Sequence, residues 1–329
     1  MMKPGVRYYA KVMLFGEYSL MVGSHALTMP YTGFEGGLGF FTDGPAQLRS
    51  AAENSNRQLL AFFHFLSDVD PEIRPGGLSP GQPFSSILRL KDFSRDLENG
   101  LYFASTIPSG YGLGSSGALV AAVYGRYAMA PYSFEHSGNE AGQLTRLKAL
   151  LGGMESFFHG TSSGIDPLSC YLQQALLLES RESIQTIRLK DFPPSFPGGF
   201  FLLDTHVTGK TGQLVRAFLS KYQTRSAGEF MRETYIPAND ACIILVVKNQ
   251  PLELEKAFRQ LSVYQREYFT GMIPDKMLSL WDKGLETGIY SLKLCGSGGG
   301  GYLIGFTPDF PTARDALSGE TIIQLPLGG

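Results

Sequence analysis

The feature that most constrains this 329-residue chain is a run of eleven residues, PSGYGLGSSGA, that begins at Pro108. Three of its four glycines lie at alternate positions, where the backbone can adopt conformations that other residues rarely reach: Gly110, Gly112 and Gly114. Directly after them, Ser115 opens an alanine-rich apolar run without proline that ends near Ala128, which predicts a buried helix. The fold must therefore contain a glycine turn that leads into a buried helix.

A glycine turn of this kind is suited to binding phosphate. Its amides can point inward, and the start of the helix adds free N–H groups and the positive end of the helix dipole. The hydroxyl of Ser116 or Ser115 can also bind Mg²⁺, a hard cation that prefers oxygen ligands. A plain flexible turn is the alternative, but the surrounding sequence favours a nucleotide-phosphate site. The predicted nucleotide-binding residues are Pro108, Gly110, Gly112, Leu113, Gly114, Ser115 and Ser116.

Composition limits the classes of protein that fit. Lys plus Arg number 28 and Asp plus Glu number 30, so the formal charge is −2. This balance argues against a nucleic-acid binder, although it leaves room for a local basic pocket. The three cysteines form no CxxC pair, which disfavours a zinc site and indicates a reducing, cytoplasmic environment. No signal peptide or membrane-spanning run is evident, so no membrane partner is expected.

Strand-like and helical patterns are mixed along the whole chain, which predicts an α+β architecture rather than a regular βαβ alternation. A proline- and glycine-rich stretch over residues 188–200 marks the expected domain boundary, giving domains 1–190 and 191–329. Strands are expected at 7–15, 26–32, 38–42, 101–105, 172–178, 200–204, 291–295 and 302–306. Helices are expected at 46–68, 115–128, 139–158, 212–222 and 251–269, with a loop or hairpin at 68–84.

Three motifs together resemble the signatures of one family. PSGYGLGSSGA is similar to the central signature of the GHMP small-molecule kinase superfamily, which includes galactokinase, homoserine kinase, mevalonate kinase and phosphomevalonate kinase. KVMLFGEY, from Lys11, resembles the N-terminal signature of mevalonate kinases, and KLCGSGGGG, from Lys293, resembles the C-terminal glycine motif. The resemblance implies a two-domain fold, with an N-terminal domain like domain 2 of ribosomal protein S5 and a ferredoxin-like C-terminal domain.

A fourth segment carries an acidic pair. ESFFHGTSSGID, from Glu155 to Asp166, resembles the mevalonate kinase pattern E…HG.PSG.D. The resemblance implies that Glu155 binds Mg²⁺, that Asp166 is the general base facing the acceptor hydroxyl, and that Lys11 lies beside Asp166. Chemistry supports these roles, because a carboxylate can accept a hydroxyl proton and a nearby cation favours its ionised form. Without the motif, Glu155 reads as a helix-surface residue, Asp166 as a capping residue and Lys11 as an outward-pointing lysine.

The C-terminal glycine run is flanked by strand-like segments, so we interpret it as a loop over the nucleotide, with Gly298 and Gly299 in contact, rather than as a linker. The predicted substrate-binding residues are Glu17, Tyr18, His25 and Thr211. Lys210 is a further candidate for binding a substrate carboxylate or phosphate. The GKT that ends at Thr211 is not a P-loop, because Asp204 stands where that motif needs glycine.

The resemblance predicts an ATP- and Mg²⁺-dependent kinase that converts mevalonate to 5-phosphomevalonate in isoprenoid precursor synthesis. The sequence Gly-Glu-Tyr ending at Tyr18 departs from the usual Gly-Glu-His, and it keeps phosphomevalonate kinase, or another GHMP kinase for a small alcohol, as an alternative. A non-catalytic ligand sensor on the same fold is the alternative of a different class. The expected partners are ATP and a small-molecule acceptor, and the family also suggests a homodimer, which no residue pattern indicates.

Overall fold

The structure is a computed structural model that describes residues 5–41, 46–68, 83–132, 140–179, 183–209 and 211–328. The chain divides into two compact units, each drawn from three segments. Unit 1 comprises Met1–Lys11, Thr32–Pro108 and Gly114–Gln173. Unit 2 comprises Val12–Tyr31, Ser109–Leu113 and Gln174–Gly329. The domain boundary near residue 190 stays a prediction, because these units are defined by contacts and are not continuous in sequence.

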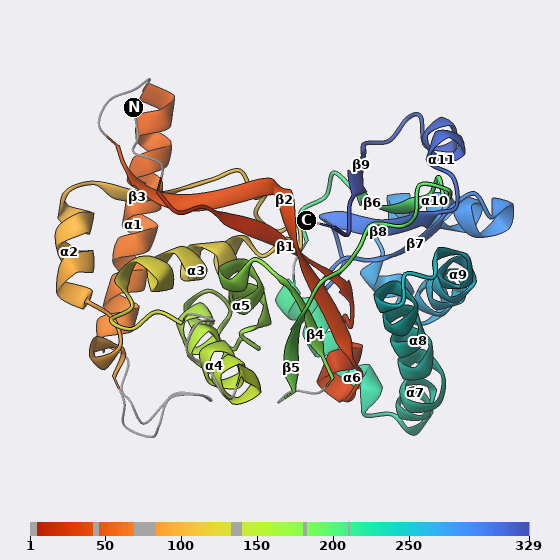
Figure 1. Cartoon of the computed structure of the whole chain (residues 1–329), viewed down its shortest axis with the longest axis horizontal. Coiled ribbons are helices and arrows are strands. Elements are labelled where there is room, and N and C mark those ends of the chain that lie inside the picture. The colour runs from red at the N-terminus through yellow and green to blue at the C-terminus, as the bar shows by residue number, and fades with distance from the viewer. Residues whose placement is uncertain are drawn as a thin grey trace. The chain divides into compact units, whose positions relative to one another are not determined.

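Two long strands contribute residues to both units: β1 (Tyr8–Phe15) and β2 (Ala26–Phe40). Unit 1 adds the strand β3 (Leu101–Ser105) and five helices, α1 (Ala46–Asp68), α2 (Leu90–Glu98), α3 (Ser115–Tyr127), α4 (Glu140–His159) and α5 (Ile165–Leu172), with a short 3₁₀ turn η3 (Phe84–Ser86). Helices α3, α4 and α5 pack together, and α1 packs on β3 and α2 (Figure 1). The mixed helix-and-sheet architecture confirms the α+β prediction.

The structure corrects the expectation of two short strands at 26–32 and 38–42, because β2 runs unbroken over its 15 residues. Two glycines in the stretch between the expected strands are paired with β3, Gly36 opposite Ser105 and Gly37 opposite Ala104. A Cβ on Gly36 would lie 2.3 Å from the Phe103 ring. Glycine is therefore required here because a neighbouring side chain crosses the strand, and not because the strand ends.

Helix α3 is buried over most of its length, as its small apolar residues predict. Its contact with α5 is unusually close at Gly117, where a Cβ would lie 2.8 Å from the backbone carbon of Asp166. The turn into α5 is close to α4 as well, since a Cβ on Gly164 would lie 1.9 Å from the Lys148 carbonyl oxygen. These contacts fix the start of α5, and with it Asp166, against two neighbouring helices.

Unit 2 contains a four-stranded sheet in the order β7-β8-β6-β9, and its registered pairs are antiparallel. The strands of this sheet are β6 (Gly199–Asp204), β7 (Ser291–Leu294), β8 (Tyr302–Thr307) and β9 (Ile322–Leu325). Unit 2 also contains β4 (Ala175–Leu178) and β5 (Ile184–Ile187), which pair with each other outside this sheet. Its helices are α6 (Thr211–Tyr222), α7 (Arg225–Phe230), α8 (Ile236–Val247), α9 (Pro251–Tyr268), α10 (Asp275–Thr287) and α11 (Phe310–Ala316). Short 3₁₀ turns lie at η1 (Ser19–Val22) and η6 (Thr270–Met272), and a π-helical turn η5 (Met231–Tyr235) precedes α8.

Aromatic side chains form the centre of the unit 2 core. The rings of Phe200 and Phe306 have centroids 4.9 Å apart, and Phe258 from α9 packs edge-on or tilted against both. Helix α9 thus packs on one face of the sheet, against β7 and β8 (Figure 1).

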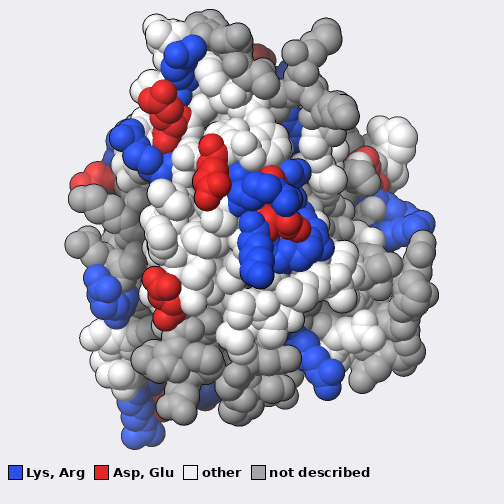
Figure 2. All heavy atoms as spheres, turned by 90° about the vertical axis from the view of Figure 1, so that its left-hand side faces the viewer, with Lys and Arg blue, Asp and Glu red and all other residues white. Residues whose placement is uncertain are grey.

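Charged groups on the surface of unit 1 are mixed in sign. Arg89 and Arg95 both pair with Asp92, and Arg126 pairs with Asp96. Figure 2 shows acidic side chains lying among the basic ones on the face that carries α1 and α2. Among the residues that the structure describes, none of the helices combines the length and the apolar character needed to cross a bilayer.

Candidate active site

Lys11 and Asp166 form an ion pair in unit 1, with Lys11 Nζ 2.9 Å from Asp166 Oδ1. Lys11 comes from β1 and is 3% exposed, whereas Asp166, in the first turn of α5, is 33% exposed. A Cβ on Gly114, which has φ +73°, would lie 2.9 Å from Lys11 Cγ. The glycine that ends the loop therefore provides the space for the lysine, and the lysine presents its charge to a carboxylate that remains accessible.

Glu155 is buried at 3% exposure, and hydroxyl groups bond to both of its carboxylate oxygens. Ser116 Oγ donates to Oε1 at 2.9 Å, and Ser162 Oγ donates to Oε2. Burial, with the negative charge of Asp166 as a second cause, raises the pKa of Glu155 to about 7. An apposed divalent cation would favour the ionised form of such a carboxylate.

The donor atoms around Glu155 fit Mg²⁺. This ion prefers octahedral oxygen ligands at about 2.0–2.1 Å and is usually held by one or two carboxylates together with substrate phosphates, so neighbouring ligands lie about 2.9 Å apart. Ser116 Oγ and Glu155 Oε1 have that separation. Across the described ranges, no cluster of three or more His, Cys, Asp or Glu side chains forms a self-contained metal site. The cluster therefore offers a cation one carboxylate and one hydroxyl.

The predicted phosphate loop crosses the division between the two units. Pro108 belongs to unit 1, residues 109–113 to unit 2, and Gly114, Ser115 and Ser116 to unit 1. Leu113 is buried, and Ser115 and Ser116 are half-buried at the start of α3. All three alternate glycines of the loop have φ between +73° and +77°, as their spacing predicts.

Within unit 2, residues of the phosphate loop pack against the C-terminal glycine loop. A Cβ on Gly112 would lie 2.9 Å from the Cys295 carbonyl oxygen, and one on Gly301 would lie 2.5 Å from Tyr111 Cα. Gly298 and Gly299 both adopt positive φ, and the Gly299 N–H donates to the Met272 carbonyl at 2.6 Å. The two glycine motifs thus form one backbone-packed assembly.

Glu17 and Tyr18, predicted to bind substrate, contact the C-terminal motif in unit 2. Glu17 is buried in an ion pair with Lys293, which also donates to the Leu294 carbonyl at 2.8 Å. Tyr18 donates its hydroxyl hydrogen to the Ser297 carbonyl at 2.5 Å, and its burial raises the pKa of its phenol. These side chains therefore join the N-terminal motif KVMLFGEY to the C-terminal glycine motif KLCGSGGGG.

His25 and Thr211 complete the predicted acceptor contacts. His25 Nδ1 lies 2.7 Å from Asp240 Oδ2, and the His25 backbone N–H donates to the other oxygen of Asp240 at 3.1 Å. This pairing orients the imidazole, which is partly exposed. Thr211 begins α6, but its side chain and the whole of Lys210 lie outside the described residues.

Sequence reasoning missed two contacts of the Glu155 cluster. Ser162 bonds to Glu155, and His159 Nε2 lies 3.1 Å from Ser116 Oγ. The four-residue spacing from Glu155 to His159, which places both on one helix face, was a signal for the histidine. Ser162 has no comparable signal, since a serine in a polar turn is common.

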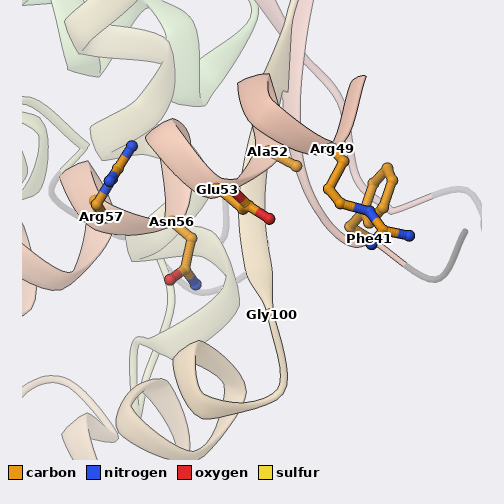
Figure 3. Close-up of a pocket in the computed structure, with 7 residues that line it drawn as sticks. All are labelled: Phe41, Arg49, Ala52, Glu53, Asn56, Arg57 and Gly100. Carbon is orange, nitrogen blue, oxygen red and sulfur yellow. The ribbon is translucent and has the colours of Figure 1, made fainter. Parts of the chain in front are cut away.

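A pocket of about 550 Å³ lies elsewhere in unit 1. Figure 3 shows that most of its lining side chains come from α1, with Phe41 following β2 and Gly100 preceding β3. The amide of Asn56 in this pocket donates to the carbonyls of Leu97 and Leu101, at 3.1 and 2.7 Å. Asn56 therefore joins α1 to the end of α2 and the start of β3. The lining residues are distinct from those of the motifs: Phe41, Arg49, Ala52, Glu53, Asn56, Arg57 and Gly100.

Part of the chain matches the model of a known protein family. Residues 86–174, which include the glycine loop, Glu155 and Asp166, match the family model of the GHMP kinases N terminal domain. No curated protein sequence matches the chain.

Solved structures resemble the chain over nearly its full length. Mevalonate kinase from L. major, in complex with R-mevalonate, has a TM-score of 0.61 at 13% identity, covering 99% of this chain and 97% of that one. Mevalonate kinase from Methanococcus jannaschii has a TM-score of 0.56 at 16% identity, covering 100% and 98%. Phosphomevalonate kinase from Streptococcus pneumoniae, in complex with phosphomevalonate and AMPPNP, has a TM-score of 0.56 at 13% identity, covering 98% of both chains.

The fold and the family match define the class of protein as an ATP-dependent small-molecule kinase. Residues 86–174 carry the GHMP kinases N terminal domain, and the fold of the chain resembles that of mevalonate kinases.

Proposed function

We propose that the chain transfers the terminal phosphoryl group of ATP to the hydroxyl of mevalonate, forming 5-phosphomevalonate. The observation that carries the proposal is the ion pair between buried Lys11 and accessible Asp166. It supplies an accessible carboxylate held in place by a buried cation, which can orient an alcohol and accept its proton. The likeness of the fold to two mevalonate kinases, one of them in complex with R-mevalonate, supports this choice of acceptor.

In the proposed reaction Asp166 accepts a hydrogen bond from the acceptor hydroxyl and takes its proton as the new O–P bond forms and ADP leaves. Lys11 holds the Asp166 carboxylate in place and adds positive charge near the transferred group. Because phosphoryl transfer passes through a loose transition state, positioning and charge stabilisation account for most of the catalysis. No covalent intermediate on the protein is needed.

The nucleotide phosphates are proposed to bind the glycine loop and the exposed N–H groups at the start of α3. Ser116 and Glu155 would hold Mg²⁺, because they offer adjoining hard oxygen donors. When bound, the ion neutralises charge on the phosphate oxygens. Gly298 and Gly299 are proposed to act through the shape of their loop rather than through chemistry.

Phosphomevalonate kinase is the second candidate. It is favoured by Tyr18, which replaces the usual histidine and bonds to the Ser297 carbonyl. The likeness to a phosphomevalonate kinase in complex with its substrate gives further support. A cytoplasmic location and a homodimer stay predictions.

The experiment is an ATP-consumption assay with mevalonate and 5-phosphomevalonate side by side, followed by a panel of small alcohols. We expect turnover with mevalonate that exceeds turnover with 5-phosphomevalonate. The reverse preference would assign the second candidate. ATP consumption that no alcohol increases would instead favour a ligand sensor.

A further inference from the structure

Ser162 lies in the turn between α4 and α5 and bonds in two directions at once. Its hydroxyl donates to Glu155 Oε2, and its oxygen accepts the N–H of Gly164 at 3.0 Å. A serine hydroxyl has one hydrogen to donate, so the bond to Glu155 uses it. Together the two bonds fix the orientation of the side chain.

The backbone on which Ser162 acts has little freedom to shift. Gly164 is the N-cap of α5 and has φ +74°, and a Cβ there would lie 1.9 Å from the Lys148 carbonyl oxygen. Asp166 follows two residues later. Ser162 therefore connects the Glu155 carboxylate to a rigid turn that also sets the position of Asp166.

The two oxygens of Glu155 have different surroundings. Oε2 bonds to Ser162 in the rigid turn, whereas Oε1 bonds to Ser116, whose hydroxyl also lies 3.1 Å from His159 Nε2. The Ser116 hydrogen consequently has a second acceptor within reach when that nitrogen is unprotonated. Oε1 and Ser116 Oγ can thus give up their mutual hydrogen bond and bind a cation, while Oε2 stays bonded to Ser162.

We propose that Ser162 is a positioning residue that holds Glu155 Oε2, so that Oε1 and Ser116 Oγ are presented together to the divalent cation of the bound nucleotide. This inference rests on the proposed function for the cation and the nucleotide. The mevalonate kinase pattern has proline at this position, so the hydroxyl is a feature of this chain.

The test measures Mn²⁺ binding to the full-length protein with ADP, using the electron paramagnetic resonance signal of free Mn²⁺. Outer-shell partners of metal ligands typically contribute about 10–100-fold to metal affinity. We expect Ser162→Ala to weaken Mn²⁺ binding by about 10-fold and Ser162→Thr to restore most of it. Ser163→Ala is the matched control, since Ser163 is exposed and its hydroxyl oxygen accepts a long 3.4 Å bond from the Ile165 N–H.

A second measurement separates positioning from general damage to the fold. In Ser162→Ala the metal concentration for half-maximal turnover should rise, while the KM for the acceptor at saturating metal stays near the wild-type value. Should Ser162→Ala fold poorly by circular dichroism, Ser162→Cys fills the space of the hydroxyl with a slightly larger and weaker donor and is expected to weaken Mn²⁺ binding as well.

Equal Mn²⁺ affinities for Ser162→Ala, or for Ser162→Cys in its place, and for Ser163→Ala overturn the inference. Expected Mn²⁺ results together with no phosphorylation of any alcohol would reject the proposed function alone. A wild-type protein that binds no Mn²⁺ with ADP would reject both.

Discussion

Lys293 and Glu17 form an ion pair with both side chains essentially inaccessible, although 276 positions of the chain separate them. The ammonium group also lies 5.5 Å from the centre of the Phe15 ring. Removal of ions from water is costly, and the pair is tolerated because each charge compensates the other. The pair joins the N-terminal motif to the strand that leads into the C-terminal glycine loop.

The first prediction concerns this pair. Lys293→Met leaves Glu17 buried without its cation, which should lower the free energy of unfolding by about 3–5 kcal/mol. The double variant Glu17→Gln, Lys293→Met removes both charges and should recover part of the loss. Urea denaturation followed by circular dichroism measures both. Equal losses in the single and double variants would mean that the uncompensated charge is not the cause.

The second prediction concerns Asp166. Asp166→Asn keeps the size of the side chain but cannot take a proton, so kcat should fall by roughly 10²–10⁴-fold. The KM for ATP should change little, because the phosphate loop is intact. Asp282→Asn is the control, since it removes a carboxylate whose partner is Arg266 in unit 2. Near-normal kcat in Asp166→Asn would remove it as the base.

Much of the helical structure could be predicted from the sequence. The expected helix at 46–68 agrees with α1, and the ends of α3, α4 and α9 agree within one residue, because their apolar periodicity or small-residue content is strong. For α8 no element was predicted. Its run of Ile and Val has strand-like composition, and packing against α9 overrides that preference.

The candidate site residues that belong to a recognised motif could be predicted from the sequence. The spacing between Glu155 and Asp166, together with the glycine loop, identified the residues that unit 1 brings together around Lys11. The pairing of Glu17 with Lys293 was not predictable. Both residues lie in recognised motifs, but nothing in their local sequences specifies a partner 276 positions away.

The third prediction follows from Glu155. Its folded-state pKa of about 7 lies above its ordinary value of 4.5, so folding disfavours the ionised form. The contribution of this group to stability is therefore fully present below about pH 4.5 and is lost as the pH rises through 7. Glu155→Gln should remove this dependence.

Thermal unfolding with EDTA and without nucleotide, from pH 5 to 8, measures it. The Tm of the wild type minus that of Glu155→Gln should fall as the pH rises. A difference that stays constant across this range would contradict the assignment. Mg²⁺ and ADP should reduce the pH dependence in the wild type, because a bound cation compensates the ionised carboxylate.

The fourth prediction tests the contact that positions Asp166. In Gly117→Ala the new Cβ would lie 2.8 Å from the Asp166 backbone carbon and 2.9 Å from the Pro167 nitrogen. Backbone cannot rotate away as a flexible side chain can, so α5 must shift. A displacement of about 1 Å at a catalytic group can reduce the rate on the order of 10²-fold. We therefore expect kcat to fall with a smaller change in the KM for ATP.

Gly153→Ala in α4 is the matched control for this substitution. Its Cβ would meet the Phe84 ring at 3.6 Å, an ordinary van der Waals distance. Since alanine is favoured over glycine inside a helix, this variant should gain about 0.5–1 kcal/mol of stability and keep its kcat. Steady-state kinetics and urea denaturation of both variants measure the contrast. If Gly117→Ala behaves like Gly153→Ala, the α3–α5 contact does not set the position of Asp166, and the rate must depend on Lys11 and the turn at Gly164 instead.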